Sequence, residues 1–258
     1  MTLSVQIVVI VGSEKRKITM VKQFAELDIP FPVYYLSASI PSNTALYLPD
    51  NIEDYRQRHI CCSKSHIRAI EYAARQTSSD VTIVMEDDAA LHKTKFIPTV
   101  LELLKNWDTI MPADSQMLSL GWIPLKNFSF YELAKSEHYL KTVNNIKLLS
   151  WFAYGTQAYM VKKTAAQKIY PLINHRTHEE LKTYIHSLNN SYIPKDDPIE
   201  NVDWWMNRLF TQSILFELLV IERREKSIIN SPVSNNFQMW DVFFKDYEEQ
   251  KKNYWSYA

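Results

Sequence analysis

Short, almost uninterrupted runs of apolar residues recur along this chain, separated by stretches with helical periodicity. Val5 to Val11 is the first such run, and "VTIVM" at 81–85 and "QMLSLG" at 116–121 are others. Strands that are buried on both faces have this composition, whereas half-exposed strands alternate apolar and polar residues. The pattern predicts an α/β protein with a mostly parallel sheet that helices cover on both faces.

Helical periodicity is clearest in "SKSHIRAIEYAARQ", at 63–76, where apolar residues recur on one face. A loop-like stretch from Pro41 to Tyr55 precedes this helix. Residues 186–201 are the best candidate for a mobile loop. Because no stretch resembles an interdomain linker, we expect a single domain over residues 1–258.

The charge balance and the cysteines restrict the partners and the compartment. Lys and Arg total 29 and Asp and Glu total 29, so no overall field favours nucleic acid, and we expect no such partner. The only cysteines, Cys61 and Cys62, are adjacent, which disfavours a disulfide and indicates a reducing compartment. The first apolar run is too short to span a membrane and lacks a basic leader, so a cytoplasmic protein is expected.

The C-terminal segment "MWDVFFKDYEEQKKNYWSYA" combines aromatic residues with lysines. Such a segment could hold the protein peripherally at the inner surface of a membrane, beside a lipid-linked substrate. Packing of these aromatic residues in the core is the interpretation we prefer.

Three consecutive acids, Glu86, Asp87 and Asp88, follow the apolar run at 81–85. In a parallel α/β sheet the helix before a strand begins at the edge where that strand ends, and ligands bind at this edge. We therefore expect Ser65 and His66 to lie near the acids. If strand geometry continues through the motif, Glu86 and Asp88 point to one side and Asp87 to the other, with alternate residues about 7 Å apart.

Neighbouring carboxylates repel each other and need a cation or hydrogen-bond donors to stay ionised. Hard oxygen ligands at a strand end suit Mg²⁺ or Mn²⁺, so the motif predicts a divalent metal site. Two alternatives stay open. The acids could be a solvated strand end that caps the next segment, or a metal site of the kind found in phosphatases and nucleases.

Residues 61–91, "CCSKSHIRAIEYAARQTSSDVTIVMEDDAAL", resemble glycosyltransferase family 25, which includes lipopolysaccharide and collagen galactosyltransferases. Members show a C-x-x-S-H segment, then a helix, then an apolar strand that ends in E-D-D. Similar later blocks are "SLG" at 119–121, "GTQAYMVKKTAAQKIYPL" at 155–172 and "ENVDWWM" at 200–206. The resemblance therefore covers most of the chain.

The resemblance implies a GT-A-like, Rossmann-like fold and the inverting transfer of a hexose, most often galactose from UDP-galactose. Asp88 and Glu86 would hold Mn²⁺ or Mg²⁺, and Glu86 could also approach the ribose of the donor. Asp87 would be a further ligand or would orient one. The donor-binding part would cover residues about 1–125 and the acceptor side about 126–258.

Inversion also needs a base that takes the proton of the acceptor hydroxyl. Asp203 is the candidate, because it lies in the block "ENVDWWM" beside Trp204, whose ring suits the face of a sugar. The alternative interpretation is that Asp203 only stabilises the start of a helix through the helix dipole.

The remaining candidate contacts to donor or acceptor are small or polar residues of the matching blocks. They are Gly12, Ser65, His66, Gly155, Thr156, Gln157 and Tyr159. The chain has three glycines, each at the end of a predicted strand, where a turn or a close ligand approach needs no side chain. A turn requirement alone explains the glycines equally well, and packing alone could explain a buried histidine.

The leading hypothesis is a metal-dependent transferase that moves a hexose from a UDP-sugar to a glycan, such as a lipooligosaccharide or a lipid-linked oligosaccharide. A metal-dependent phosphoesterase is the alternative enzyme. A noncatalytic module that binds a nucleotide sugar or a glycan is the alternative from another class, and it would show ligand binding without turnover.

Overall fold

The computed structural model describes residues 2–40, 52–123, 140–143, 145–149, 154–174, 178–187, 202–223 and 252–255. The strands are β1 (Val5–Val11), β2 (Val33–Ser37), β3 (Val81–Glu86), β4 (Ala89–Leu91), β5 (Met117–Ile123), β6 (Leu140–Val143), β7 (Ile146–Leu149), β8 (Tyr154–Lys162), β9 (Gln212–Leu215) and β10 (Val220–Glu222). The helices are α1 (Glu14–Glu26), α2 (Ile52–Arg75), α3 (Phe96–Lys105), α4 (Trp107–Ile110), α6 (Lys163–Ile173), α7 (His178–Ser187) and α8 (Val202–Leu209).

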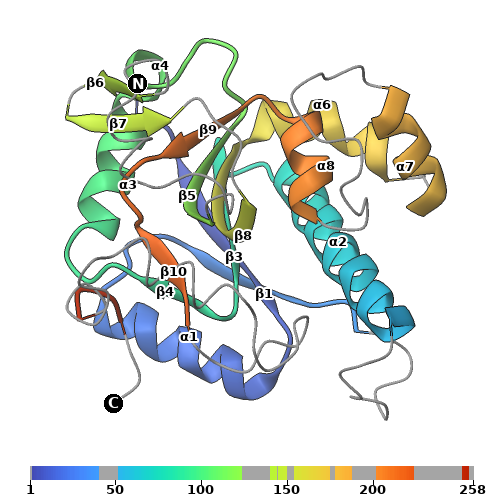
Figure 1. Ribbon diagram of the computed structural model, residues 1–258. Helices are drawn as coiled ribbons and strands as arrows, with labels where there is room; N and C mark the ends of the chain where they lie inside the picture. The colour runs from blue at the N-terminus through green and yellow to red at the C-terminus, as the bar shows by residue number, and fades with distance from the viewer. Residues whose placement is uncertain are drawn as a thin grey trace.

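Eight of these strands form one mixed sheet in the order β2-β1-β3-β8-β5-β9-β7-β6 (Figure 1). Strands β1, β2, β3, β5, β6 and β9 run in one direction, and β7 and β8 run in the other. The expected fold class, a mostly parallel α/β sheet flanked by helices, is confirmed. The reversed β8, between β3 and β5, is a feature that the apolar runs do not reveal.

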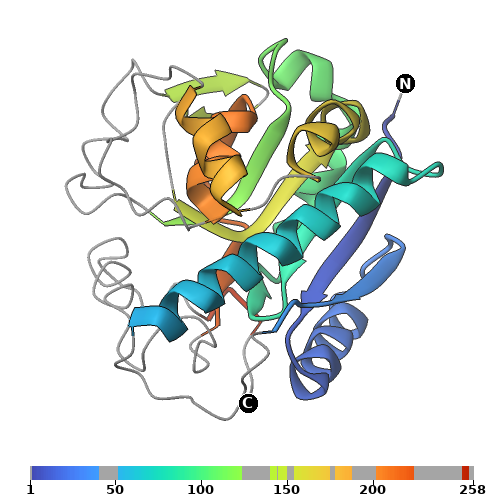
Figure 2. The ribbon, with the colours of Figure 1, turned by 90° about the vertical axis from the view of Figure 1, so that its right-hand side faces the viewer.

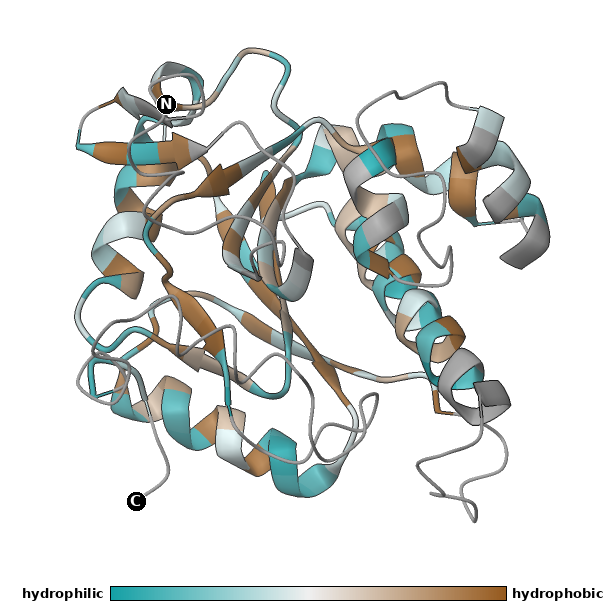
Figure 3. Ribbon diagram, in the orientation of Figure 1, coloured by the Kyte–Doolittle hydropathy of each residue, from teal (hydrophilic) through white to brown (hydrophobic). Residues whose placement is uncertain are grey.

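Two hydrophobic clusters cover the two faces of the sheet. One packs the strands against α1, α3 and α4, and the other packs them against α2, α6, α7 and α8. Figure 2 looks onto the second face, which α2 crosses diagonally, and Figure 3 shows the apolar character of the central strands. Because both faces are buried, β1 and β3 have no polar alternation, which is why their sequences read as continuous apolar runs.

Helix α2 is longer at its start than the sequence predicts. It begins at Ile52, so the last part of the expected loop is helical, while residues 41–51 lie outside the described part of the chain. The added turns are rich in Glu, Arg and Gln, which are good helix formers but carry no apolar periodicity. The expected mobile loop at 186–201 also falls largely outside the described residues, and only its first two residues are seen, at the end of α7.

A small second sheet, β4 and β10, lies at the carboxyl end of β3 and carries part of the candidate site. The two strands pair antiparallel, with Glu222 opposite Ala89. The N–H of Leu219 also donates to the carbonyl of Leu120 on β5, at 3.0 Å. The chain leaves the large sheet at the end of β3 and enters the small sheet at β4. The acids of the E-D-D motif therefore lie where the two sheets meet.

Gly121 on β5 lies tightly against β10. A Cβ atom there would lie 2.6 Å from the carbonyl oxygen of Val220 and 3.2 Å from its Cβ. We therefore expect Gly121→Ala to lower the free energy of unfolding by about 1–3 kcal/mol, as overpacking does elsewhere. Thermal unfolding measures this loss, and an unchanged melting temperature would contradict the close approach.

Tyr254 and Trp255, at the C-terminal end, pack into the protein. The hydroxyl of Tyr254 donates to the carbonyl of Leu218 at 2.7 Å, and the indole of Trp255 donates to Glu26 at 2.5 Å. These two aromatic residues are therefore packed in the core, which is the interpretation preferred from the sequence. Within the described ranges, every helix is too short or too polar to cross a bilayer.

Candidate active site

The carboxyl ends of β1 and β3 lie side by side and bring Gly12 to the acids. The two strands are parallel, with Ile10 opposite Glu86. The N–H of Gly12, just beyond β1, donates to Oδ2 of Asp87 at 2.6 Å. The edge of the sheet that the sequence selects as the ligand-binding edge is therefore where these residues meet.

Helix α1 adds a cation to this edge. Ser13 caps the helix by accepting a hydrogen bond from the N–H of Arg16 at 3.3 Å. The cap places Arg16 in the first turn, where its Nη1 lies 3.0 Å from Oδ1 of Asp87 and 3.6 Å from Oδ2 of Asp88. Burial raises the pKa of Asp87, and Arg16 and the Gly12 N–H oppose that rise. Arg16 thus partly neutralises both aspartates.

The strand geometry expected for the three acids does not persist. Strand β3 ends at Glu86, and Asp87 and Asp88 form a turn before β4. Because of this turn, Asp87 and Asp88 both approach Arg16 instead of pointing to opposite sides. The antiparallel pairing of β4 with β10 provides the physical reason, since it requires the chain to leave the sheet directly after Glu86.

Glu86 faces helix α2 and strand β8. Its Oε1 accepts from the hydroxyl of Thr156 at 2.5 Å and lies 3.5 Å from Nε2 of His66. The other ring nitrogen of His66, Nδ1, lies 3.1 Å from the hydroxyl of Tyr159. Burial alone would raise the pKa of Glu86, but the His66 ring and the Thr156 hydroxyl lower it overall. The predicted proximity of His66 to the acids is thus observed, together with Thr156 and Tyr159.

Asp88 has a different environment, because its neighbours are mostly acids. Burial, Glu222 and Glu86 raise the pKa of Asp88 well above its usual range, and Arg16 opposes them. Its Oδ1 is buried and has no hydrogen-bond partner among the described residues. A buried carboxylate oxygen without a partner, beside two further acids, suits a hard divalent cation such as Mg²⁺ or Mn²⁺. Asp88 is therefore a candidate ligand for such an ion, with Glu86 and Glu222 as the acids whose charges act on it.

Glu222 and Arg223, on and just after β10, are site residues that the sequence does not identify. The N–H of Arg223 donates to the carbonyl of Asp88 at 2.6 Å, and its guanidinium donates to the carbonyl of Asp87. The guanidinium also lies over the ring of Trp255. Arg223 thus fixes the backbone of the acidic turn. The only sequence signal was a charged pair at the end of an apolar run, which is too common to be informative.

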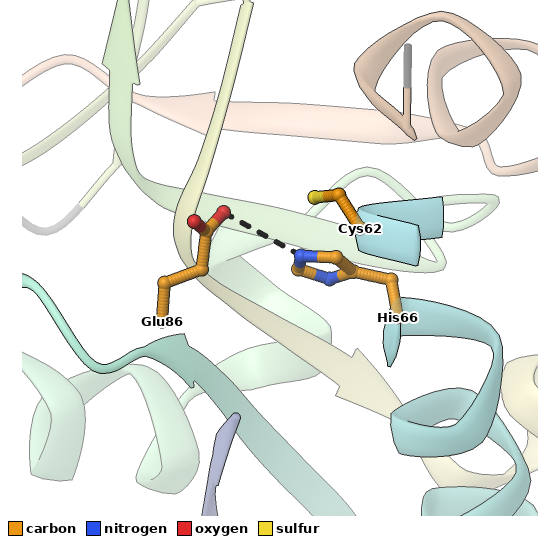
Figure 4. Close-up of side chains that lie close together, drawn as sticks. All are labelled: Cys62, His66 and Glu86. Carbon is orange, nitrogen blue, oxygen red and sulfur yellow. Dashed lines mark ion pairs between the residues drawn. The ribbon is translucent and has the colours of Figure 1, made fainter. Parts of the chain in front are cut away.

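Cys62 and Asp203 extend the site toward helices α2 and α8. Cys62 projects from α2 one turn before His66, and both side chains face Glu86 (Figure 4). Burial and the charges of Glu86, Asp203 and Asp88 raise the pKa of the Cys62 thiol well above its usual range. Asp203, in the first turn of α8, is therefore within electrostatic reach of the Cys62 thiol.

The other residues that the sequence analysis selected differ in their surroundings. The hydroxyl of Ser65 is engaged by backbone, since it donates to the carbonyl of Cys61 and accepts from the N–H of Ser39, both at 2.8 Å. Gly155 has a φ of 109°, which glycine adopts without strain. Gln157 is buried on β8, and its Oε1 has no hydrogen-bond partner in the described ranges. The backbone of Trp204 belongs to α8, but its side chain lies outside what the structure describes.

The position of Glu222 gives a testable pH dependence. Burial and the charge of Glu86 raise its pKa to about 7, with Arg16 opposing. In the unfolded chain this carboxyl has a pKa of about 4.3, so it ionises more readily there than in the folded protein. The metal-free protein therefore loses stability as the pH rises from about 4.3 to about 7. We expect Glu222→Gln to remove this loss, which is at most about 4 kcal/mol. The gain of Glu222→Gln over wild type should therefore be larger at pH 8 than at pH 5.

Thermal unfolding in the presence of a chelator, at both pH values, measures the gain. Glu14→Gln is the control, since the Glu14 side chain is 74% exposed. Equal effects of Glu222→Gln at the two pH values would contradict the burial of an unfavourable charge at this position.

No protein-family model matches the chain, and no curated protein matches it by sequence. Solved structures of glycosyltransferases do match it. A glycosyltransferase involved in the glycosylation of the major capsid of PBCV-1 is 12% identical, with a TM-score of 0.40 over 92% of this chain and 98% of that chain. The galactosyltransferase LgtC in complex with donor and acceptor sugar analogs is 10% identical, with a TM-score of 0.45 over 98% of this chain and 97% of that chain. An active-site mutant of LgtC is likewise 10% identical, with a TM-score of 0.44 and the same coverage.

Proposed function

We propose that this protein is a metal-dependent, inverting glycosyltransferase that transfers a hexose from a UDP-sugar to a glycan acceptor. Galactose is the proposed sugar and a lipooligosaccharide or related lipid-linked glycan the proposed acceptor, on the basis of the blocks that resemble glycosyltransferase family 25. The observation that carries the proposal is the acidic cluster of Glu86, Asp88 and Glu222 at the carboxyl edge of the sheet, in which the buried Oδ1 of Asp88 has no hydrogen-bond partner among the described residues.

The acidic cluster has the charges that a metal-bound diphosphate needs. In this proposal Asp88 and Glu86 are oxygen ligands for Mn²⁺ or Mg²⁺, which usually also bind substrate phosphates, and Glu222 adds negative charge beside them. When bound, the ion would act as a Lewis acid that stabilises the negative charge of the departing UDP. Arg16 provides a second positive charge in the first turn of α1, where the helix dipole also favours an anion.

The residues around the acidic cluster have separate proposed tasks. The Gly12 N–H and Arg16 hold Asp87 in place, so that the acidic turn keeps its shape when a ligand enters. Thr156 and His66 hold Glu86 toward α2. In this proposal Asp203, whose charge acts on the Cys62 thiol beside Glu86, is the base that takes the proton of the acceptor hydroxyl. Attack from the side opposite UDP then inverts the anomeric carbon.

A screen of nucleotide sugars by thermal shift, with and without Mn²⁺, tests the proposal. We expect UDP-galactose with Mn²⁺ to raise the melting temperature more than either ligand alone, because the ion and the diphosphate bind together. A transfer assay with lipooligosaccharide acceptors then follows the release of UDP. Failure of all nucleotide sugars to bind with Mn²⁺ would overturn the proposal.

The same assays separate the competing functions. Release of phosphate from simple esters without any sugar acceptor would indicate a phosphoesterase. Ligand-dependent stabilisation without turnover on a broad acceptor panel would indicate a binding module.

A further inference from the structure

A second set of ligand atoms shares Glu86 with the acidic cluster and has a different chemistry. The thiol of Cys62, the imidazole of His66 and the carboxylate of Glu86 offer ligand atoms that all lie within 4.8 Å of one another (Figure 4). Cys62 and His66 are four residues apart on α2, a spacing that places both side chains on the same face of the helix. Glu86 approaches them from the end of β3.

His66 is buried with one nitrogen facing this space. Its side chain is 1% exposed, and its Nε2 has no hydrogen-bond partner among the described residues. The 3.5 Å separation between Nε2 and Oε1 of Glu86 exceeds a normal N–H···O hydrogen bond. Its Nδ1 lies 3.1 Å from the hydroxyl of Tyr159, which is the kind of contact that orients a histidine ligand. A cation between Nε2 and Oε1 would give the buried Nε2 a partner.

The structure assigns to Cys62, His66 and Glu86 a binding site for a thiophilic divalent cation of the Zn²⁺ class. Thiolate and imidazole select such ions over Mg²⁺ and Mn²⁺, which prefer oxygen ligands. In a tetrahedral zinc site the ligand atoms lie about 3.3–3.8 Å apart, so side-chain rotations would bring the three groups to bonding distance. The fourth position is left for water or a substrate oxygen.

The charges and protons of this site balance. Binding converts the thiol to a thiolate and releases one proton to solvent, as metal sites with cysteine ligands require. Thiolate and carboxylate then supply two negative charges that neutralise the divalent ion, and the imidazole stays neutral. The surrounding carboxylates of Asp88 and Asp203 further favour a cation at this place.

The site has a consequence that depends on the proposed function. Glu86 belongs both to this site and to the acidic cluster of Glu86, Asp88 and Glu222, which in the proposed function receives the donor and its metal ion. A bound thiophilic ion holds Glu86 toward α2, so it opposes binding of Mn²⁺ and the UDP-sugar. The protein is therefore expected to be inhibited by Zn²⁺.

Cobalt spectroscopy of the full chain tests the site without any donor. After treatment with a chelator, Co²⁺ should give a thiolate-to-cobalt charge-transfer band and intense visible bands, which added Zn²⁺ removes. The matched pair is Cys62→Ser against Cys61→Ser, since both thiols are free but only Cys62 belongs to the cluster. The band should vanish in Cys62→Ser and persist in Cys61→Ser. A band retained in Cys62→Ser, or no band in wild type, would overturn the inference.

Two further measurements do not require that the cysteine variant folds. X-ray absorption of the Zn²⁺-loaded wild-type protein should show a sulfur neighbour at about 2.3 Å, and a shell of only nitrogen and oxygen would contradict the site. Tyr159→Phe should weaken Zn²⁺ binding about 10-fold or more, because it removes the partner of Nδ1. An unchanged affinity for Zn²⁺ in Tyr159→Phe would show that Tyr159 does not orient His66.

The inhibitory effect is measured separately. Zn²⁺ should reduce the stabilisation by UDP-galactose and Mn²⁺ in wild type and in Cys61→Ser, but not in Cys62→Ser. If no nucleotide sugar binds while the cobalt band is present, the proposed function fails and the metal site stands. If sugars bind and the band is absent, the metal site fails and the proposed function stands.

Discussion

Asp88→Asn is expected to give a more stable metal-free protein that no longer responds to Mn²⁺ and a nucleotide sugar. The wild-type carboxylate is buried beside Glu86 and Glu222, and its Oδ1 has no hydrogen-bond partner in the described part of the chain. Asparagine keeps the shape, removes the charge and adds two N–H donors for the neighbouring carboxylates. The melting temperature should therefore rise in the presence of a chelator.

The same substitution should nearly abolish transfer. A metal ion that stabilises the leaving group contributes several kcal/mol in typical sites, which corresponds to a loss of about 10³-fold or more in rate. The measurements are thermal unfolding with chelator, thermal shift with Mn²⁺ and UDP-galactose, and UDP release. If Asp88→Asn retains the Mn²⁺-dependent rise in melting temperature, Asp88 is not a ligand of the metal ion.

Asp87→Asn is the matched contrast within the same motif. Asp87 accepts the Gly12 N–H and pairs with the buried Arg16, so its charge has a partner. Its loss leaves the guanidinium with less compensation, and the melting temperature should fall. Asp114→Asn, at an exposed position, is the control for the substitution itself. Equal effects at 87 and 88 would mean that the two aspartates have equivalent environments, contrary to the structure.

The fold was largely predictable from the sequence because β1 and β3 are buried on both faces. Their apolar runs indicate a parallel, covered sheet, and the structure has one. Strand direction is less visible, because β8 has the same composition whether it pairs parallel or antiparallel with its neighbours. The start of α2 was missed for a related reason, since its first turns are polar and lack periodicity.

Strand geometry predicted the candidate site only where its residues lie on neighbouring parallel elements. The rule that ligands bind at the carboxyl edge brings His66 and the acids together, and the structure does the same. Gly12, and Thr156 and Tyr159 on the antiparallel β8, were selected through the blocks that resemble the family. Glu222 and Arg223 reach the site through the antiparallel pairing of β10 with β4. Nothing local to either strand encodes that pairing, so these two residues could not have been found from sequence periodicity.

Asp203→Asn is expected to lower the rate of transfer by about 10²–10⁴-fold while leaving donor binding intact. The expectation follows from its proposed task, since a general base contributes about this much to a rate. Asp203 lies in the first turn of α8, near enough to raise the pKa of the Cys62 thiol, but the acids that chiefly raise the pKa of Asp88 are Glu222 and Glu86. The thermal shift with UDP-galactose and Mn²⁺ should therefore persist.

The alternative interpretation predicts a different pattern for the same variant. If Asp203 only complements the dipole of α8, its replacement costs about 0.3–1 kcal/mol of stability and leaves the rate per folded molecule unchanged. Rate and melting temperature measured on the same samples distinguish the two. The pH dependence adds a second criterion, because the acidic limb of the wild-type rate profile should disappear only if Asp203 is the base. A large loss of rate with unaltered donor binding would place proton removal at α8, within electrostatic reach of the Cys62 thiol.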